Sequence, residues 1–337
     1  KYLSQTLIFN GEIYNTDYLS IKLKSINISV ESNCDTEILS KFLFHFGIDS
    51  LSEIRGMYSF CIYDSKNKKF IATRDPLGIK PLFYCYDSES IIFSSESSVF
   101  ENKKINIKSF ESFMVFGYVH NDGSLLSEVK KMMPGEVHVI DTENFSVNRF
   151  FFEKEFKYFL NIPERNESIE DLLNSSINEQ LISDVPIGLF LSGGIDSSLI
   201  AYHSSKKIPG INCYVSQYFG DESERFNSDL RFAKKLSKEL DLNLIHVPIN
   251  PQSENFSEDF LAWASSLDEP QANITGFSSF LLFKKAKLDG TKVILTGDGA
   301  DEIFGGYKRY HHALLLERLK FLRFFPKFSN YYSTNKL

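Results

Sequence analysis

Two glycine-rich strings that carry acidic residues are the parts of this 337-residue chain best suited to chemistry. The first, at residues 187–198, reads Ile-Gly-Leu-Phe-Leu-Ser-Gly-Gly-Ile-Asp-Ser-Ser, so an apolar run stops at two glycines and resumes as a helix-compatible segment. Glycines let the backbone approach a ligand closely, and the loop amides with the hydroxyls of Ser192, Ser197 and Ser198 would converge on an anion at the positive end of a helix. The string predicts a phosphate-binding loop, and an ordinary turn with a helix cap is the alternative.

The second string, Thr296-Gly297-Asp298-Gly299-Ala300-Asp301-Glu302, also follows an apolar run. Triphosphate chemistry needs a divalent cation, and Mg²⁺ prefers a few carboxylates together with phosphate oxygens. Asp196 and Asp301 are therefore the metal candidates, although each could instead be a helix N-cap or a loop acid. Asp298 could hold or deprotonate a nucleophile, because a general base must lie within hydrogen-bonding reach of it. The lysine of a Walker loop is absent from the first string, which argues against a kinase-like or GTPase loop.

A third string, Phe9-Asn10-Gly11-Glu12-Ile13-Tyr14-Asn15, lies near the start of the chain. A strand that ends in Asn-Gly can present a side-chain amide and a backbone N–H together, and these are the two donors of an oxyanion hole. The alternative is a hairpin turn, which Asn-Gly signals more often than catalysis. Cys61, Cys85 and Cys213 fall in strand-like runs, which predicts buried and inert thiols.

The elements that would position the first two strings alternate as a parallel sheet with helical crossovers requires. The pattern predicts strands at 189–191, 211–218, 244–247 and 292–295, and helices at 229–240, 256–266 and 275–287. In an open parallel sheet, ligands bind beyond the carboxyl ends of the strands, which is where both strings fall. The two strings should therefore face the same site.

The first half of the chain has a different pattern of short apolar or alternating runs. It predicts strands at 6–9, 58–63, 69–73, 82–86, 91–94, 136–140 and 147–152, and helices at 36–46 and 108–116. The economical architecture is an α+β antiparallel sandwich followed by an α/β doubly wound parallel sheet. We expect domain boundaries at 1–155 and 166–337, with a linker at about 156–167.

Composition fits a two-domain globular protein, since 42% of the residues are hydrophobic and 24% are charged. A net charge of −7 argues against nucleic-acid binding, although the end with Lys320, Arg323 and Lys327 is locally basic. No apolar run approaches the length of a membrane span. Four scattered cysteines predict a reducing compartment, hence a cytoplasmic protein.

The first two strings, with Asp268-Glu269-Pro270 between them, resemble the ATP-pyrophosphatase synthetase domain of glutamine-hydrolysing asparagine synthetases over residues 168–310. The resemblance implies Mg²⁺ at Asp196 and Asp301. The residues that it implies as ATP contacts are Leu191, Ser192, Gly193, Gly194, Asp196, Ser197, Ser216, Thr296 and Gly297. Asp298 stands where many relatives carry a glutamate important for aspartyl-adenylate formation, and its side chain is one methylene shorter. Ser216-Gln217 is also atypical of the family's small apolar strand at this place.

The first half resembles the class II glutamine amidotransferase domain, whose motifs occur here in order. They are Asn10-Gly11-Glu12, Asp35-Thr36-Glu37, Gly56-Met57-Tyr58-Ser59-Phe60 and Arg74-Asp75-Pro76-Leu77-Gly78-Ile79-Lys80-Pro81-Leu82. The resemblance implies that Asn10 and Gly11 stabilise an oxyanion, that Glu12 and Asp35 hold the glutamine α-amine, and that the Arg74 motif is structural. The family's nucleophile is an amino-terminal cysteine, and no cysteine stands at the start of this chain. The family also continues through a helical region after the position of Tyr310, whereas this sequence stops at Leu337. We therefore expect a chain truncated at both ends.

Together the two resemblances imply an asparagine synthase, a carbon–nitrogen ligase. Glutamine hydrolysis would release ammonia, which would attack an aspartyl-adenylate made from ATP and aspartate and release AMP, after pyrophosphate has left. The implied partners are these small molecules, with a homodimer left open. One alternative is an amidotransferase acting on another carboxylate, such as a surface-sugar or secondary-metabolite acid. A non-catalytic regulatory relative is the other.

Overall fold

The computed structural model describes residues 2–86, 90–100, 102–151, 167–220, 223–228 and 230–318 of the chain. It divides into two compact units, the first made of Lys1–Asp184 with Asn250–Phe283 and the second of Val185–Ile249 with Lys284–Leu337. Residues 156–166 of the expected linker and the basic end at Lys320, Arg323 and Lys327 lie outside the described residues.

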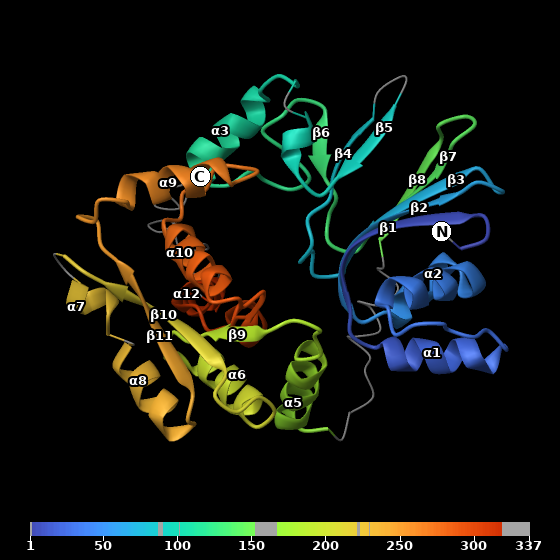
Figure 1. The fold of residues 1–337 in the computed structure, drawn as a ribbon. Coiled ribbons are helices and arrows are strands. Elements are labelled where there is room, and N and C mark those ends of the chain that lie inside the picture. Colours follow the sequence, from blue (N-terminus) through green and yellow to red (C-terminus); the bar gives the residue numbers. More distant parts are fainter. Residues whose placement is uncertain are drawn as a thin grey trace. The chain divides into compact units, whose positions relative to one another are not determined.

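The first unit contains two antiparallel sheets (Figure 1). Five strands pair in the order β1-β2-β3-β7-β8, with bounds Gln5–Ile13, Gly56–Asp64, Lys69–Arg74, Glu136–Asp141 and Val147–Phe151. Three strands pair in the order β5-β4-β6, with bounds Ile91–Ser94, Phe83–Tyr86 and Val129–Lys131. The alternating runs predict each of these strands except β6, whose three residues include two lysines.

Two helices cover one face of the five-stranded sheet (Figure 1). α1 (Thr16–Ser25) and α2 (Asp35–Phe46) bury Leu19, Leu39 and Phe42 in one core with residues of β1 and β2. The sequence pattern predicts α2 but not α1. On α1 only Leu19 and Leu23 are buried, whereas other apolar residues are exposed, so its sequence shows no clear apolar stripe.

The other face of the five-stranded sheet packs against the three-stranded sheet. Cys61 in β2 and Ala72 in β3 share a buried core with Tyr84 in β4 and with Met132. The layers are thus helices, sheet and sheet, which confirms the predicted α+β antiparallel sandwich. The unit also contains η1 (Ile48–Glu53), η2 (Ser97–Phe100), α3 (Ile107–Phe116), α5 (Ile169–Gln180), α9 (Phe256–Ser265) and most of α10 (Thr275–Leu288).

The second unit is built on a parallel sheet in the order β11-β10-β9-β12. The strand bounds, from β9 to β12, are Ile187–Phe190, Asn212–Tyr218, Asn243–Ile249 and Val293–Leu295. The helices are α6 (Ile195–Ser205), α7 (Ser223–Phe226), α8 (Leu230–Glu239), α11 (Ala300–Phe304) and α12 (Lys308–Arg318). Leu189, Leu191, Ala201 and Cys213 are fully buried in its core. The predicted α/β parallel-sheet class is confirmed.

Two smaller expectations concern the thiols and the membrane. Cys61, Cys85 and Cys213 are buried as predicted, and burial raises the pKa of Cys61 and of Cys213 to about 12. Such thiols stay protonated at neutral pH and are poor nucleophiles. Among the described residues, no helix is both long enough and apolar enough to cross a membrane.

Candidate functional site

The order of strands in the parallel sheet brings the first two glycine-rich strings together. β9 pairs with β10 on one side and with β12 on the other, so the direction of winding reverses between β9 and β12. Leu189 and Leu295 are register partners close to the carboxyl ends of these two strands. Ligands bind at such a switch point, where loops diverge from neighbouring strand ends and leave a crevice. The expectation that both strings lie at one edge of the sheet is therefore confirmed.

The two loops touch through a glycine. A Cβ added to Gly297 would lie 3.1 Å from the Cβ of Asp196 and 3.2 Å from the amide nitrogen of Ser197. A larger residue at position 297 would require the start of α6 to shift by a few tenths of an ångström. The absence of a side chain here thus lets the second loop lie directly against the first turn of the helix.

The first loop is shaped by its own serine hydroxyls. The Ser192 and Ser197 hydroxyl oxygens lie 3.0 Å apart, the Gly194 N–H donates to Ser192 Oγ, and Ser197 Oγ donates to the Gly194 carbonyl. Gly193 has φ of +90°, which favours glycine. α6 begins after Gly194 without a side-chain cap, so the first N–H groups of the helix face the loop rather than a capping oxygen. The arrangement presents a helix N-terminus that can accept a phosphate.

The second loop carries three acidic side chains with different surroundings. Asp298 is exposed, and its carboxylate accepts a 2.7 Å hydrogen bond from Thr296 Oγ1. The Glu302 carboxylate accepts a 2.8 Å bond from the Tyr307 hydroxyl, and this bond lowers the pKa of Glu302. Asp301 is half-buried, and its carboxylate sits against the backbone of Gly306.

Gly306 leaves the space that the Asp301 carboxylate occupies. A Cβ added at Gly306 would overlap Asp301 Oδ1 and would lie 2.9 Å from its Cγ, while the Gly306 N–H donates to the Asp301 carbonyl at 3.0 Å. This contact was not anticipated from the sequence. The Gly305-Gly306 pair directly after α11 was the available signal, but a glycine pair does not show which side chain it makes room for.

The donor set fits Mg²⁺ in a phosphate site better than a metal held by protein alone. No group of three or more His, Cys, Asp or Glu residues within the described ranges could hold a metal ion. Asp196 and Asp301 belong to the two loops that meet at Gly297. Mg²⁺ in nucleotide sites takes one or two carboxylates and completes its shell with phosphate oxygens and water, so two aspartates suffice.

Ser216 lies at the same edge of the sheet. β9 pairs with β10 only as far as Phe190 and Tyr214, and the Leu191 N–H donates to the Tyr214 carbonyl at 3.0 Å. Ser216 is two residues further along β10, beyond the end of β9. The side-chain amide oxygen of its atypical neighbour Gln217 lies 3.1 Å from Nδ1 of His246 on β11. The Gln217 side chain is therefore engaged by the neighbouring strand.

The third string forms a strand edge rather than a turn. Asn10 and Gly11 lie inside β1, where they pair with Ser59 and Tyr58 of β2. The hairpin alternative is therefore wrong, and the strand runs on to Ile13. A Cβ on Gly11 would overlap the Met57 carbonyl oxygen and lie 2.8 Å from the Tyr58 Cα, so only glycine fits this close approach of two backbones.

The Gly11 N–H points away from β2. Tyr58 is its register partner. On the side of β3, the Tyr58 N–H donates to Asp75 Oδ2 at 3.3 Å, and the Tyr58 carbonyl accepts a hydrogen bond from the Asp75 N–H at 2.7 Å. In an antiparallel pair, two opposed residues either bond each other or both turn outward. Because β1 is the first strand in the order of the described sheet, the Gly11 N–H faces an edge on which no other described strand pairs, beside the exposed Asn10.

Two carboxylates lie along this edge. The Ile13 N–H, which points the same way as that of Gly11, donates to Asp35 Oδ2 at 3.3 Å. The pKa of Glu12 is raised, first by burial and then by the charges of Asp35 and Asp184, against a lowering contribution from Lys80. Burial also raises the pKa of Tyr14 to about 12, helped by Glu12. Carboxylates whose charges repel in this way are suited to binding a cation such as an ammonium group.

The Arg74 motif is used inside the protein. The Arg74 guanidinium donates to the carbonyls of Lys80, Met132 and Gly78 at 2.6–2.7 Å. Asp75 is 1% exposed, and besides the Tyr58 N–H it accepts three loop N–H groups, from residues 77, 79 and 80. These contacts agree with a structural role for both residues.

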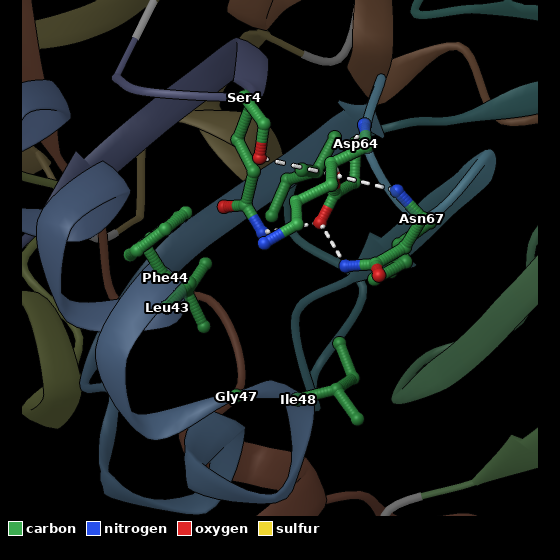
Figure 2. Close-up of a pocket in the computed structure, with 11 residues that line it drawn as sticks. Ser4, Leu43, Phe44, Gly47, Ile48, Asp64 and Asn67 are labelled. Carbon is green, nitrogen blue, oxygen red and sulfur yellow. Dashed lines mark hydrogen bonds between the residues drawn. The ribbon is translucent and has the colours of Figure 1, made fainter.

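A cavity of about 240 Å³ lies at the other end of β1 and β2 (Figure 2). Asp64, the only carboxylate among the described residues that line it, accepts hydrogen bonds from the side chains of Ser4, Gln5 and Asn67 and from two backbone N–H groups. Burial works against these bonds, but they prevail and lower the pKa of Asp64 to about 2. The Asp64 carboxylate is saturated by these bonds and has little capacity left to bind a ligand.

Two family models match the chain. The asparagine synthase model matches residues 168–335 and the glutamine amidotransferase domain model matches residues 1–151. The asparagine synthetase [glutamine-hydrolyzing] 1 of Bacillus subtilis (strain 168) is 32% identical over 92% of this chain and 49% of its own length. A putative asparagine synthetase [glutamine-hydrolyzing] 2 of Methanocaldococcus jannaschii is 29% identical over 96% of this chain and 62% of its own length.

The chain thus spans about half to three-fifths of the length of these curated relatives. Among solved structures, an allosteric regulatory enzyme of purine biosynthesis aligns with 82% of this chain and 71% of its own at 15% identity. Its TM-score of 0.33 is too low to bear on the fold. The two matched regions and the two sites identify the chain as a member of the asparagine synthase family, with an amidotransferase part followed by an asparagine synthase part.

Proposed function

We propose that the intact protein is a glutamine-dependent asparagine synthetase: it adenylates aspartate with ATP and amidates the adenylate with ammonia from glutamine. The observation that carries this proposal is the meeting of the two glycine-acid loops at the switch point between β9 and β12. Domain boundaries at 1–155 and 166–337 belong to the proposal and are supported by the two matched regions. Four free cysteines, three of them buried, support a reducing compartment such as the cytoplasm.

Glutamine would bind along the edge of β1. The Gly11 N–H and the Asn10 side-chain amide would donate to the amide oxygen of glutamine as its carbon becomes tetrahedral. Glu12 and Asp35 would hold the α-ammonium group. The N–H groups of Gly11 and Ile13 are about 7 Å apart along the strand. That separation is comparable to the reach of a glutamine from its amide oxygen to its amine.

ATP would bind with its phosphates on the loop at 192–198. An aspartate carboxylate oxygen would bond to the α-phosphorus while the bond from that phosphorus to pyrophosphate breaks. Ammonia would then bond to the acyl carbon and lose a proton as AMP leaves. Mg²⁺, when bound by Asp196 and Asp301, would supply positive charge to the phosphates. Asp298 would hold or deprotonate the incoming nucleophile from its place beside Thr296.

Isotope exchange between pyrophosphate and ATP tests the adenylation step without glutamine. We expect magnesium-dependent exchange that requires aspartate. Asp298→Asn should lower exchange or the later amidation while leaving nucleotide affinity within about twofold, because it removes only a charge. Asp289→Asn is the matched control, since Asp289 is an acid of the same unit that pairs with Lys285 away from the loops.

Two outcomes would replace the proposal. Exchange with another carboxylate and not with aspartate would keep the adenylating mechanism and change the substrate, as the atypical Asp298 and Ser216-Gln217 leave open. Exchange with no carboxylate, in a folded protein that still binds nucleotide, would favour a non-catalytic regulatory relative.

A further inference from the structure

The connection between α9 and α10 is fastened to the amidotransferase part by three separate contacts. The Ser97 N–H donates to Asp268 Oδ1 at 2.6 Å, and Ser97 Oγ donates to the Asp268 carbonyl at 3.0 Å. Lys131 Nζ lies 2.8 Å from Glu269 Oε2. The Ala272 N–H donates to the Gly117 carbonyl at 3.4 Å. All of these residues belong to the first compact unit.

The ion pair is largely withdrawn from water. The side chains of Lys131 and Glu269 are 22% and 18% exposed. Glu269 Oε1 is buried and has no hydrogen-bond partner within the described ranges, so Lys131 is the main compensation for the carboxylate charge. Removing one member of such a pair leaves the other as a poorly compensated charge, which costs much more than breaking an exposed pair.

The third contact is sterically specific. Gly117 ends α3 in the left-handed region with φ of +77°, and an added Cβ would lie 2.9 Å from the Ala272 Cβ. The connection therefore lies directly on the end of α3. The five residues Asp268–Ala272 are thus held by three elements: η2, β6 and the end of α3.

The fastened segment is continuous with a tightly packed helix pair. The rings of Phe256, Phe260 and Trp263 on α9 lie 5.3–5.7 Å from that of Phe277 on α10. A Cβ on Gly276 would lie 3.2 Å from the Trp263 ring, so the start of α10 packs tightly on α9. Along the chain, α10 is followed by β12, and the loop with Asp298 and Asp301 comes next.

We propose that Asp268–Ala272 is a coupling joint, in which Lys131 and Glu269 act as positioning residues for glutamine-supported synthesis. Lys131, Ser97 and Gly117 belong to the region matched by the glutamine amidotransferase model, and the joint belongs to the region matched by the asparagine synthase model. The joint keeps the helix that leads to the acidic loop fixed to the part that releases ammonia. This role rests on the proposed function.

Charge reversal in the intact protein tests the joint. Lys131→Glu and Glu269→Lys should each lower the asparagine formed per glutamate released by about fivefold, while synthesis from added ammonium stays within about twofold. The double reversal should restore most of the ratio, because the pair is re-formed with opposite polarity. Lys130→Glu is the matched control, since Lys130 directly precedes Lys131 in the sequence. It pairs with Asp122 at the surface, where both side chains are at least 40% exposed.

The role is overturned if the folded single variants keep the wild-type ratio. It is equally overturned if they lose glutamine-supported and ammonium-supported synthesis in parallel without rescue by the double reversal, because that is the result of a general structural defect. Glu269→Gln, which keeps the shape and removes the charge, should lower the ratio in the same direction. A wild-type protein that neither hydrolyses glutamine nor adenylates aspartate would instead overturn the proposed function, and the coupling role would fall with it.

Discussion

The strand edge at Gly11 and the loop site around Gly297 use the same parts, glycine backbone and carboxylates, but hold them differently. Gly11 lies within a nine-residue strand whose partner strand is fixed by Asp75, a carboxylate that receives four N–H groups. In the loop site, Asp298 is exposed and accepts one side-chain hydrogen bond from its own loop.

The two sites differ in what holds their functional groups in place before a ligand binds. At the strand edge, sheet pairing fixes the direction of the Gly11 N–H. This donor is therefore already in position in the folded protein, and ligand binding needs no further loss of conformational entropy there. In the loop site, the carboxylates belong to two loops that meet at Gly297, and the exposed Asp298 is held by a bond from its own loop, so a nucleotide and a metal ion would complete the order. Substitutions that disturb the strand backbone of the first site should therefore appear as lost stability, and changes in the second site as lost binding.

Gly11→Ala gives the largest expected effect. Its Cβ would overlap a backbone carbonyl that belongs to a paired strand and cannot move alone. We expect a loss of about 3 kcal/mol or more in the free energy of unfolding, measured by urea denaturation. Gly210→Ala is the control: Gly210 has φ of +68° but no atom within 4 Å of its added Cβ, so backbone strain of about 1 kcal/mol is the only cost. Equal losses in the two variants would contradict a sterically fixed edge.

Gly306→Ala tests the loop site in the same way. The added Cβ would displace the Asp301 carboxylate, but this half-buried side chain can turn outward, so the unfolding free energy should change by less than about 1 kcal/mol. We expect the magnesium-dependent part of ATP affinity to fall about tenfold, as when a metal ligand loses its support. Titration calorimetry with and without Mg²⁺ measures both parts. An unchanged magnesium dependence would remove Asp301 from the metal site.

Much of this comparison could be read from the sequence, because the relevant signals are local. Alternating runs predict β1 and β2, and apolar runs that end in glycine-acid strings predict β9 and β12 with their loops. The meeting of these loops followed from one rule, that parallel strands end at a common edge. Asn10-Gly11 was harder, since the same dipeptide suits a turn, and only the pairing of Gly11 with Tyr58 decides the matter.

The remainder depends on contacts between distant parts of the chain. Lys131 and Glu269 are 138 positions apart, and although Glu269 lies in the Asp268-Glu269-Pro270 string, no local pattern shows that it pairs with Lys131. β6 is a strand because it pairs with β4, which lies more than 40 positions earlier in the chain. The four N–H groups on Asp75 arise from a loop whose path no local pattern specifies. Such features become visible only when the elements are placed together.

Glu12→Gln separates binding from stability at the strand edge. The raised pKa of Glu12 means that its ionised form is less favourable in the folded chain than in the unfolded one. We expect this substitution to raise the melting temperature at neutral pH, and the gain to shrink as pH falls through the folded pKa of Glu12, where the wild-type carboxyl becomes neutral. The KM for glutamine should rise about fivefold, because one partner of the ammonium group is lost. A lower melting temperature would show that the Glu12 charge is compensated rather than strained.

Tyr307→Phe should have the smallest effect, since it alters one exposed hydrogen bond in the loop site. The Tyr307 hydroxyl is the main cause of the lowered pKa of Glu302, so its removal should raise that pKa toward the ordinary value. A carboxyl whose folded pKa is lowered stabilises the fold above its unfolded pKa and loses that contribution as pH falls. At the surface, water and salt screen the interaction, so pyrophosphate exchange at neutral pH should stay within about twofold. Titration of the Glu302 carboxyl by NMR measures the shift. A large loss of exchange would show that Tyr307 and Glu302 act on the bound nucleotide, and that the loop site is as tightly prearranged as the strand edge.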